Sequence, residues 1–222
     1  MSERAILAAW NKDVDSLNFT IQSKIAGELR SYKSVDSTTD ENEADNYSTE
    51  FLNSFDVPGT PPYNLQLKVG SITIMLRNLN PPKLCNGTRL SVKKLMNNVI
   101  QSTIIKGNFK GEEVLIPRIL IIPTDLTFQF PVRLAFAMTI NKSQDQPLEV
   151  CEINLEYACF SHGQLYVASS RVGKTSSLFI FAPKNKTKNI SLFEGGETGE
   201  LNHRVHLIKK KNFGQNNVCR VS

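Results

Sequence analysis

The chain has 222 residues, of which 40% are hydrophobic and 21% charged, and it carries 26 Lys and Arg against 21 Asp and Glu. This composition is ordinary for a chain that buries a core, so it excludes a wholly disordered protein, and the length allows one domain or two small ones. No apolar run approaches the roughly 18 residues that span a bilayer, so the sequence predicts a soluble protein.

The charge is unevenly distributed along the chain. Residues 34–62 contain seven acids and no Lys or Arg, whereas residues 63–123 contain nine Lys and Arg against two Glu. The second segment therefore has a local charge of +7, which fits either an electrostatic footprint for nucleic acid or an ordinary solvated basic surface. Charge alone leaves both interpretations open.

The N-terminal segment has the pattern of a strand followed by a helix. Residues 4–9 predict a short buried strand, and Asn11 or Asp13 can cap the helix that follows. Apolar residues of this helix recur every three or four positions, at Val14, Leu17, Ile21, Ile25 and Leu29. Residues 34–46 are acidic and without periodicity, which predicts a mobile loop, and residues 48–55 predict one or two helical turns.

The hydrophobic period changes to two from Leu65 onward. Gly70 marks a change of phase that predicts a bulge or sharp bend, and Asn86-Gly87 is a strong signal for a tight turn. About six short strands fit into residues 63–123. This segment therefore predicts a small antiparallel barrel or a curled sheet.

Alternating strands and helices return after Pro123. Buried strands are predicted over residues 132–136, 150–155 and 178–182. Ser161 and Gln164 form a capping box for a helix that reaches about Arg171. Strand, helix, strand units of this length imply a parallel sheet with a right-handed crossover.

Two segments of this α/β part are candidates for chemistry. The loop Thr139–Gln144 follows a predicted strand, where α/β sheets place ligands, and its hydroxyl, amide and ammonium groups suit backbone phosphates; a polar surface turn is the alternative. Arg171 either offsets the helix dipole or acts as an arginine finger on a transferring phosphate. The triplet GKT at 173–175 is not a P-loop, because Ala168 replaces the first Gly of that pattern and the triplet follows a helix.

The sequence predicts no metal site. His203 and His206 with Cys219 are too loosely spaced for a convincing zinc site, and the four cysteines contain no C-x-x-C pair. The cysteines are therefore interpreted as packing residues.

Several stretches of the sequence together resemble a known family. LAFAMTINKSQ at 134–144 and HGQLYVASSRV at 162–172 resemble motifs V and VI of superfamily 1B helicases, and among these the PIF-type helicases, notably those carried by Helitron transposons. LKVGSITIMLRNLNPPKLCNGTRL at 67–90 resembles the family's 2B insertion, a small β-barrel. With AILAAWNKDVDSLN at 5–18 and EFLNSF at 50–55, the resemblance covers about residues 4–189.

The resemblance implies a 5′-to-3′ ATP-dependent DNA helicase with two RecA-like domains. This chain resembles only the second domain, 2A, so the implied fold is an α/β, RecA-like parallel sheet formed by residues 1–62 and 124–190 and interrupted by a 2B barrel at 63–123. The Walker A and Walker B motifs of the first domain do not occur in the 222 residues. Residues 191–222 have no counterpart in the family and are predicted to be a disordered tail.

The resemblance also implies roles for particular residues. Arg171 would be the arginine finger, and Gln164 would lie beside the nucleotide. The residues that would face single-stranded DNA and the interdomain cleft are Thr139, Asn141, Lys142, Ser143 and Gln144. Asp145 stands where the family has Gly, and Pro147 where it has Thr or Ser, which indicates a truncated or decayed transposon copy.

Partners, cofactors and location follow from the same resemblance. The implied partner is single-stranded DNA, and ATP with Mg is expected only together with a first RecA-like domain, so the chain alone is expected to bind no cofactor and no membrane. Roles in DNA repair, recombination or telomere maintenance and a nuclear location are implied, with mitochondria or cytoplasm as alternative locations and secretion excluded. The alternative function is a non-enzymatic DNA-binding or partner-binding module.

Overall fold

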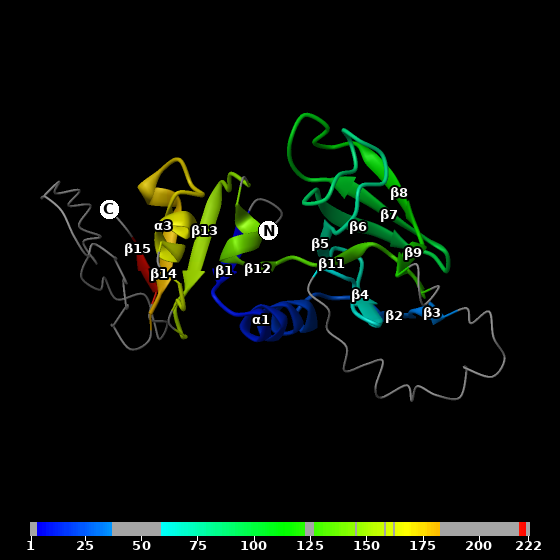
Figure 1. Cartoon of the computed structure of the whole chain (residues 1–222), viewed down its shortest axis with the longest axis horizontal. Coiled ribbons are helices and arrows are strands. Elements are labelled where there is room, and N and C mark those ends of the chain that lie inside the picture. The colour runs from blue at the N-terminus through cyan, green and yellow to red at the C-terminus, as the bar shows by residue number, and fades with distance from the viewer. Residues whose placement is uncertain are drawn as a thin grey trace, which may run out of the picture. The chain divides into compact units, whose positions relative to one another are not determined.

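The structure is a computed structural model that describes residues 4–36, 59–122, 127–144, 146–157, 159–161, 163–182 and 218–220. It divides into two units, of which unit 1 comprises residues 1–18 and 136–222 and unit 2 comprises residues 19–135 (Figure 1). The sequence pattern predicts an inserted segment at 63–123. Unit 2 is larger than this segment, because it also includes residues 19–62 and 124–135. The assignment of the units as 2A and 2B stays a prediction.

Unit 1 is built on a five-stranded sheet in the order β12-β1-β13-β14-β15. Its strands are β1 (Arg4–Ala8), β12 (Ala137–Thr139), β13 (Val150–Asn154), β14 (Leu178–Phe181) and β15 (Val218–Arg220). The first four pair in parallel, as the sequence pattern predicts. β15 pairs antiparallel with β14, so three residues of the segment predicted as a disordered tail form an edge strand.

The strands of unit 1 bury alternate hydrophobic residues in one core that includes the helix α3 (Gln164–Ser169). Leu7, Ile153 and Ile180 are at most 2% exposed and share this core with Ala168 of α3. Cys151 and Cys159 are buried in the same core, which fits their interpretation as packing residues. Burial, with a smaller contribution from the neighbouring Glu152, raises the pKa of the Cys151 thiol to about 12.

The start of α3 differs from the sequence prediction. The residue before the helix is Gly163, with a φ of 73°, and no side chain caps the helix. The predicted capping box of Ser161 and Gln164 is therefore wrong, because the left-handed backbone at Gly163, which glycine adopts without strain, turns the chain directly into the helix. The helix also ends at Ser169, two residues before the predicted end at about Arg171.

The helix α1 (Asn11–Ser23) follows β1 and packs against β1 and β12. Val14 and Leu17 pack against Ala8 and Ala137. The side chain of Asn18, which is 3% exposed, accepts a hydrogen bond from the Ala137 N–H at 2.8 Å and donates one to the Ala137 carbonyl at 3.0 Å. β12 is the outermost of the described strands of its sheet, so this amide binds backbone groups that a neighbouring strand would otherwise bind.

The helix α1 is shorter than its apolar pattern predicts. It ends at Ser23, so Ile25 and Leu29 lie beyond it, and Leu29 is 43% exposed. Gly27, with a φ of 110°, follows within four residues and redirects the chain at a position where other residues would be strained.

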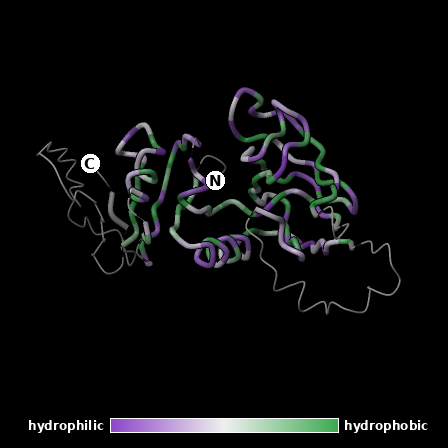
Figure 2. The backbone as a smooth tube through the Cα atoms, viewed as in Figure 1, coloured by the Kyte–Doolittle hydropathy of each residue, from purple (hydrophilic) through white to green (hydrophobic). Residues whose placement is uncertain are grey.

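Unit 2 contains a five-stranded antiparallel sheet in the order β11-β5-β6-β7-β8. Its strands are β5 (Ile72–Met75), β6 (Arg89–Leu95), β7 (Val99–Ile104), β8 (Glu113–Pro117) and β11 (Val132–Leu134). Hydrophilic and hydrophobic residues alternate along several of them (Figure 2). Gly70 and Gly87 have positive φ values in the turns before β5 and β6, as their phase change and Asn-Gly signal predict.

Two smaller sheets complete unit 2. They are β3-β10-β9, formed by Val35–Asp36, Thr127–Gln129 and Ile119–Ile122, and β2-β4, formed by Arg30–Lys33 and Asn64–Leu67. The predicted closed barrel is not confirmed, because among the described strands β8 and β11 remain unpaired edges of an open sheet. After Pro117 the chain pairs β9 with β10 instead of returning to β11.

The core of unit 2 is held together by one buried amide as well as by apolar packing. Gln129, which is fully buried, donates to the carbonyls of Tyr32 at 2.8 Å and Tyr63 at 3.1 Å, and it accepts from the Phe130 N–H at 2.9 Å. One side chain therefore joins three segments that are remote in sequence. No helix of the described residues is long and apolar enough to cross a membrane.

Replacing Asn18 by Ala is expected to destabilise the chain by at least about 2 kcal/mol. The substitution leaves the N–H and the carbonyl of Ala137 without their side-chain partner, and each such buried group costs roughly 1–3 kcal/mol. Urea unfolding followed by circular dichroism measures the loss. Ser16→Ala, at an exposed position of the same helix, is the matched control, and an equal loss in both variants would contradict the role of Asn18.

Replacing Glu152 by Gln is expected to stabilise the chain at neutral pH. Burial raises the pKa of the Glu152 carboxyl above its ordinary 4.5, so its contribution to stability is present in acid and is lost as the pH rises through the folded-state pKa. The variant should therefore melt at a higher temperature than the wild type at pH 7, and the difference should shrink toward pH 4. The control is Glu28→Gln, at an exposed carboxylate; a gain for Glu152→Gln that is independent of pH would refute the explanation.

Candidate nucleic-acid interface

Three loops of unit 1 begin at the same edge of the parallel sheet. The register pairs Ala8 of β1 with Thr139 of β12 and with Asn154 of β13, and each of these residues is the last of its strand. The segments that follow the three strands therefore leave from one level, the carboxyl edge, where open α/β sheets bind ligands. The order β12-β1-β13 places the loop after β1 between the other two strands (Figure 1).

The loop after β12 is a short 3-10 helix, η1 (Ile140–Ser143), anchored at both ends. Ile140 and Ser143 are fully buried, and the Ser143 hydroxyl donates to the Ile140 carbonyl at 2.7 Å. These anchors leave the side chains of Asn141, Lys142 and Gln144 exposed. The segment is thus a rigid turn that presents amide and ammonium groups.

Of the five residues predicted to face DNA, the structure presents three. Asn141, Lys142 and Gln144 are exposed and Thr139 is half-buried at the end of β12, whereas the side chain of Ser143 is buried. The Ser143 hydroxyl already makes a local hydrogen bond, so this residue shapes the turn instead of offering its side chain to a ligand. Asp145 and His162 lie outside the described residues.

The predicted nucleotide neighbour Gln164 connects this turn to α3. Gln164 is 5% exposed, its Nε2 donates to Asn141 Oδ1 at 3.4 Å, and its Oε1 accepts from the Phe160 N–H at 3.3 Å. A buried amide thus links the loop before α3 with η1. Two residues that are 23 positions apart in the sequence therefore belong to one hydrogen-bonded cluster.

Arg171 lies next to the same cluster and is already engaged by its own chain. Its Nε donates to the Val167 carbonyl at 2.9 Å, its Nη2 donates to Ser170 Oγ at 2.7 Å, and its Nη1 approaches the Ser143 carbonyl at 3.5 Å. A guanidinium has five N–H donors, so these bonds leave up to two for a further acceptor. The half-buried side chain is held in place and can still meet an anion.

The sequence did not single out the aromatic residues at this edge. Trp10 follows β1, and Phe160 lies in the loop after β13; their ring centroids are 4.7 Å apart, and they are 42% and 50% exposed. In the same two loops, Lys12 Nζ lies 5.3 Å from the centroid of the Tyr157 ring. The one feature of the sequence that could have drawn attention to this pair is that the chain contains a single Trp. Its contact with Phe160 depends on the pairing of β1 with β13.

The described residues contain no group of three or more His, Cys, Asp or Glu that could hold a metal ion. His203 and His206 lie outside these residues, and the Cys219 side chain is not described.

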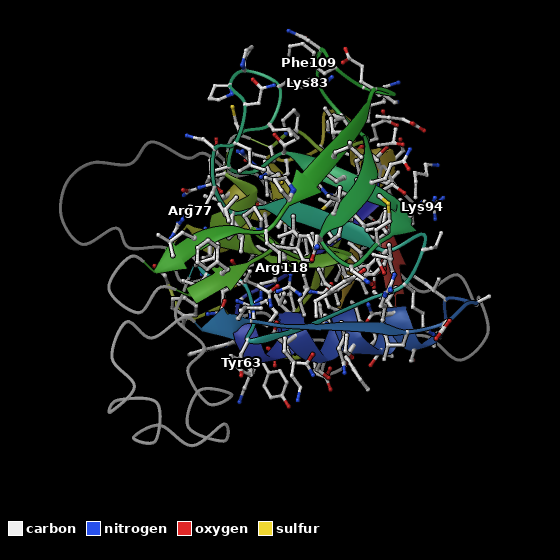
Figure 3. The ribbon with its side chains drawn as sticks, turned by 90° about the vertical axis from the view of Figure 1, so that its right-hand side faces the viewer. Tyr63, Arg77, Lys83, Lys94, Phe109 and Arg118 are labelled. Carbon is white, nitrogen blue, oxygen red and sulfur yellow. The ribbon has the colours of Figure 1, made fainter. Side chains whose placement is uncertain are left out.

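The basic segment of unit 2 is only partly available to a ligand. Arg89 is 4% exposed, and burial lowers the pKa of its guanidinium to about 10. Arg118 stacks at 4.9 Å from the Phe130 ring centroid, and Lys83 forms an ion pair with Glu112. Figure 3 shows Arg77, Lys83 and Lys94 at separate places around unit 2. Part of the local charge of +7 therefore serves packing, and these labelled cations do not gather in one patch.

Comparison with known proteins gives a consistent result. Residues 50–95 match the family model of the 2B domain of the DNA helicase Pif1. The ATP-dependent DNA helicase Pif1 of Campylobacter jejuni is 27% identical over 226 residues, which cover 94% of this chain and 48% of that protein.

Solved structures agree with the sequence matches. A structure that concerns DNA unwinding at forked double-stranded DNA by two Pif1 helicases is 25% identical, has a TM-score of 0.61 and matches 82% of this chain but 40% of its own. A Bacteroides Pif1 helicase in complex with ADP-AlF3 and single-stranded DNA has the same identity and TM-score and matches 82% of this chain and 41% of its own.

These relatives are DNA helicases. More particularly, they are Pif1 helicases, and this chain resembles their C-terminal half, so the predicted relationship to the PIF-type helicases is confirmed. The chain spans less than half the length of the Campylobacter relative.

Proposed function

We propose that this chain acts as the C-terminal part of an ATP-dependent 5′-to-3′ DNA helicase of the PIF type. In this role the carboxyl edge of the unit 1 sheet binds single-stranded DNA, and Arg171 reaches ATP held by a first RecA-like domain. The observation that carries the proposal is the cluster in which Gln164 joins Asn141 and Arg171 joins the Ser143 carbonyl. These contacts connect the exposed polar turn η1 to α3 and to Arg171, which follows α3 by two residues.

The DNA-binding part of the proposal rests on the exposed donors of η1. The exposed amide and ammonium groups come from Asn141, Lys142 and Gln144. None of these groups has to contact a particular base, so they suit the phosphates of a strand of any sequence. The Bacteroides Pif1 structure with ADP-AlF3 and single-stranded DNA supports both ligands for the family. Thr139 is a further candidate at the rim, and Ser143 contributes through its backbone.

The catalytic part assigns Arg171 as an arginine finger. Its remaining N–H donors would stabilise charge on a transferring phosphate, while Gln164, which is hydrogen-bonded to Asn141 of η1, would lie beside the nucleotide. No sequence of the Walker A type occurs in the 222 residues, so ATP and Mg would be held by the first domain. A nuclear location and an origin in a Helitron transposon remain parts of this proposal.

A second candidate function is a DNA-binding module without catalysis. The observation in its favour is that the Arg171 guanidinium donates to Val167, Ser170 and Ser143 of its own chain, as a purely structural arginine would. The two candidates share the DNA-binding edge and differ in whether Arg171 affects ATP turnover.

Replacing Lys142 by Ala is expected to lower the affinity for single-stranded DNA. The affinity of the variant should also depend less steeply on salt concentration. Each phosphate contact adds about −0.7 to the slope of log affinity against log salt concentration, so the slope should become shallower by roughly that amount for all DNA sequences. Fluorescence anisotropy with a labelled oligonucleotide at several salt concentrations measures it. Lys24→Ala, also at an exposed lysine, is the matched control. If the affinity of the wild type does not change with salt concentration, the electrostatic interface is excluded.

The purified chain is expected to show no DNA-stimulated ATP hydrolysis, because it has no P-loop to hold the phosphates and Mg. Mixing it with a first RecA-like domain from a Pif1 helicase should restore turnover, and Arg171→Ala should lower the restored rate by about 10³-fold or more. Phosphate release is the measurement, with Lys174→Ala as the control. Restored turnover that Arg171→Ala leaves unchanged would favour the non-catalytic module.

A further inference from the structure

Two exposed aromatic rings form a continuous apolar surface beside the proposed DNA-binding turn. Trp10 and Phe160 expose 42% and 50% of their surface while their ring centroids lie 4.7 Å apart with planes inclined by 49°. A contact of this kind fixes both rings in a tilted pair. Large exposed aromatic side chains that touch each other mark interaction surfaces more often than single exposed residues do.

Hydrogen bonds connect this pair to the polar turn. The Phe160 N–H donates to Gln164 Oε1 at 3.3 Å, and Gln164 Nε2 donates to Asn141 Oδ1 at 3.4 Å. Trp10 follows β1 by two residues, and Asn141 follows β12 by two residues, with Ala8 and Thr139 paired in register. The rings and the exposed amide of Asn141 therefore belong to one edge and to one connected group of residues.

We propose that Trp10 and Phe160 form a stacking surface for the bases of a single-stranded nucleic acid whose phosphates contact Asn141 and Lys142. This inference rests on the proposed DNA-binding function of the same edge and assigns to it two residues that contact bases. Single-strand binding sites combine cationic contacts to the backbone with aromatic faces for the bases, and every base has a face that can stack.

The geometry selects one mode of stacking. A base inserted between two rings needs about 7 Å between them, twice the roughly 3.4 Å step of a strand, and the pair is closed at 4.7 Å. Bases therefore stack on the outer, exposed faces of Trp10 and Phe160. This mode accepts any base and gives affinity without sequence preference.

The charges around the rings favour bases over phosphates at this spot. Lys12 lies over the Tyr157 ring, with Asp13 and Glu156 close by. Burial raises the pKa of the Asp13 carboxyl; Lys12 opposes this shift, and Glu156 adds to it. The two carboxyl groups repel a phosphate, so the backbone of the strand runs on the side of Lys142 while the bases point to the rings.

Trp10 provides a direct measurement because it is the only tryptophan of the chain. The full chain is titrated at low salt with an oligothymidylate, with an abasic oligonucleotide of equal phosphate number, and with ATP. Binding is followed by anisotropy of the labelled probe and stacking by Trp10 fluorescence. The expected result is that both oligonucleotides bind, that only the oligothymidylate quenches Trp10, and that ATP at the same base concentration does not.

Variants then separate stacking from folding. Trp10→Ala and Phe160→Ala should each weaken the binding of oligothymidylate about fivefold or more and leave the abasic oligonucleotide nearly unaffected. Trp10→Phe keeps a ring and should retain most of the affinity. Phe19→Ala, at an exposed aromatic residue of α1 (65% exposed), is the control, and circular dichroism checks that each variant folds.

The remaining outcomes are distinguishable. Binding of oligothymidylate without any change in Trp10 fluorescence, together with normal affinity of the two alanine variants, overturns the stacking surface and leaves the proposed DNA-binding edge intact. No binding of either oligonucleotide at low salt overturns both. Quenching by ATP and not by the oligothymidylate also overturns the stacking surface, because the rings would then belong to a nucleotide site.

Discussion

Parallel pairing of β1 with two strands that follow it much later in the chain is the interaction on which unit 1 depends. Ile6 lies opposite Ala137 on one side and Glu152 on the other. Parallel strands cannot be joined by a tight turn and need a long crossover connection. Here the connection between β1 and β12 contains α1 and all of unit 2, so a sheet-rich unit is inserted without changing the register.

The outer edge of that pairing is closed by a side chain. β12 has three residues and is the outermost of the described strands of its sheet. The amide of Asn18 satisfies the N–H and carbonyl of Ala137. An edge strand this short gains much of its definition from such a partner. The polar turn that follows β12 is positioned by the same bonds, which links the stability of the sheet edge to the geometry of the proposed interface.

Charge in this chain is divided between packing and binding. Arg89, Arg118 and Lys83 are committed to a buried carbonyl contact, an aromatic ring and an ion pair within unit 2. Lys142 is exposed on a rigid turn of a different unit. A segment's net charge therefore overstates its capacity to attract nucleic acid, whereas one cation on an anchored turn among amide donors is a more specific indication.

Periodicity and motif chemistry were sufficient to predict the parallel strands, the change to antiparallel strands after residue 63, the turns at Gly70 and Gly87, and the polar turn with Asn141 and Lys142. These features depend on local backbone preference and on which faces are buried, and both are written in short stretches of residues. The start of α3 at Gly163, the open sheet and the buried hydroxyl of Ser143 were not predictable in that way. They depend on which distant segments pair, as does the contact between Trp10 and Phe160, because residues 150 positions apart meet only when β1 and β13 align in register.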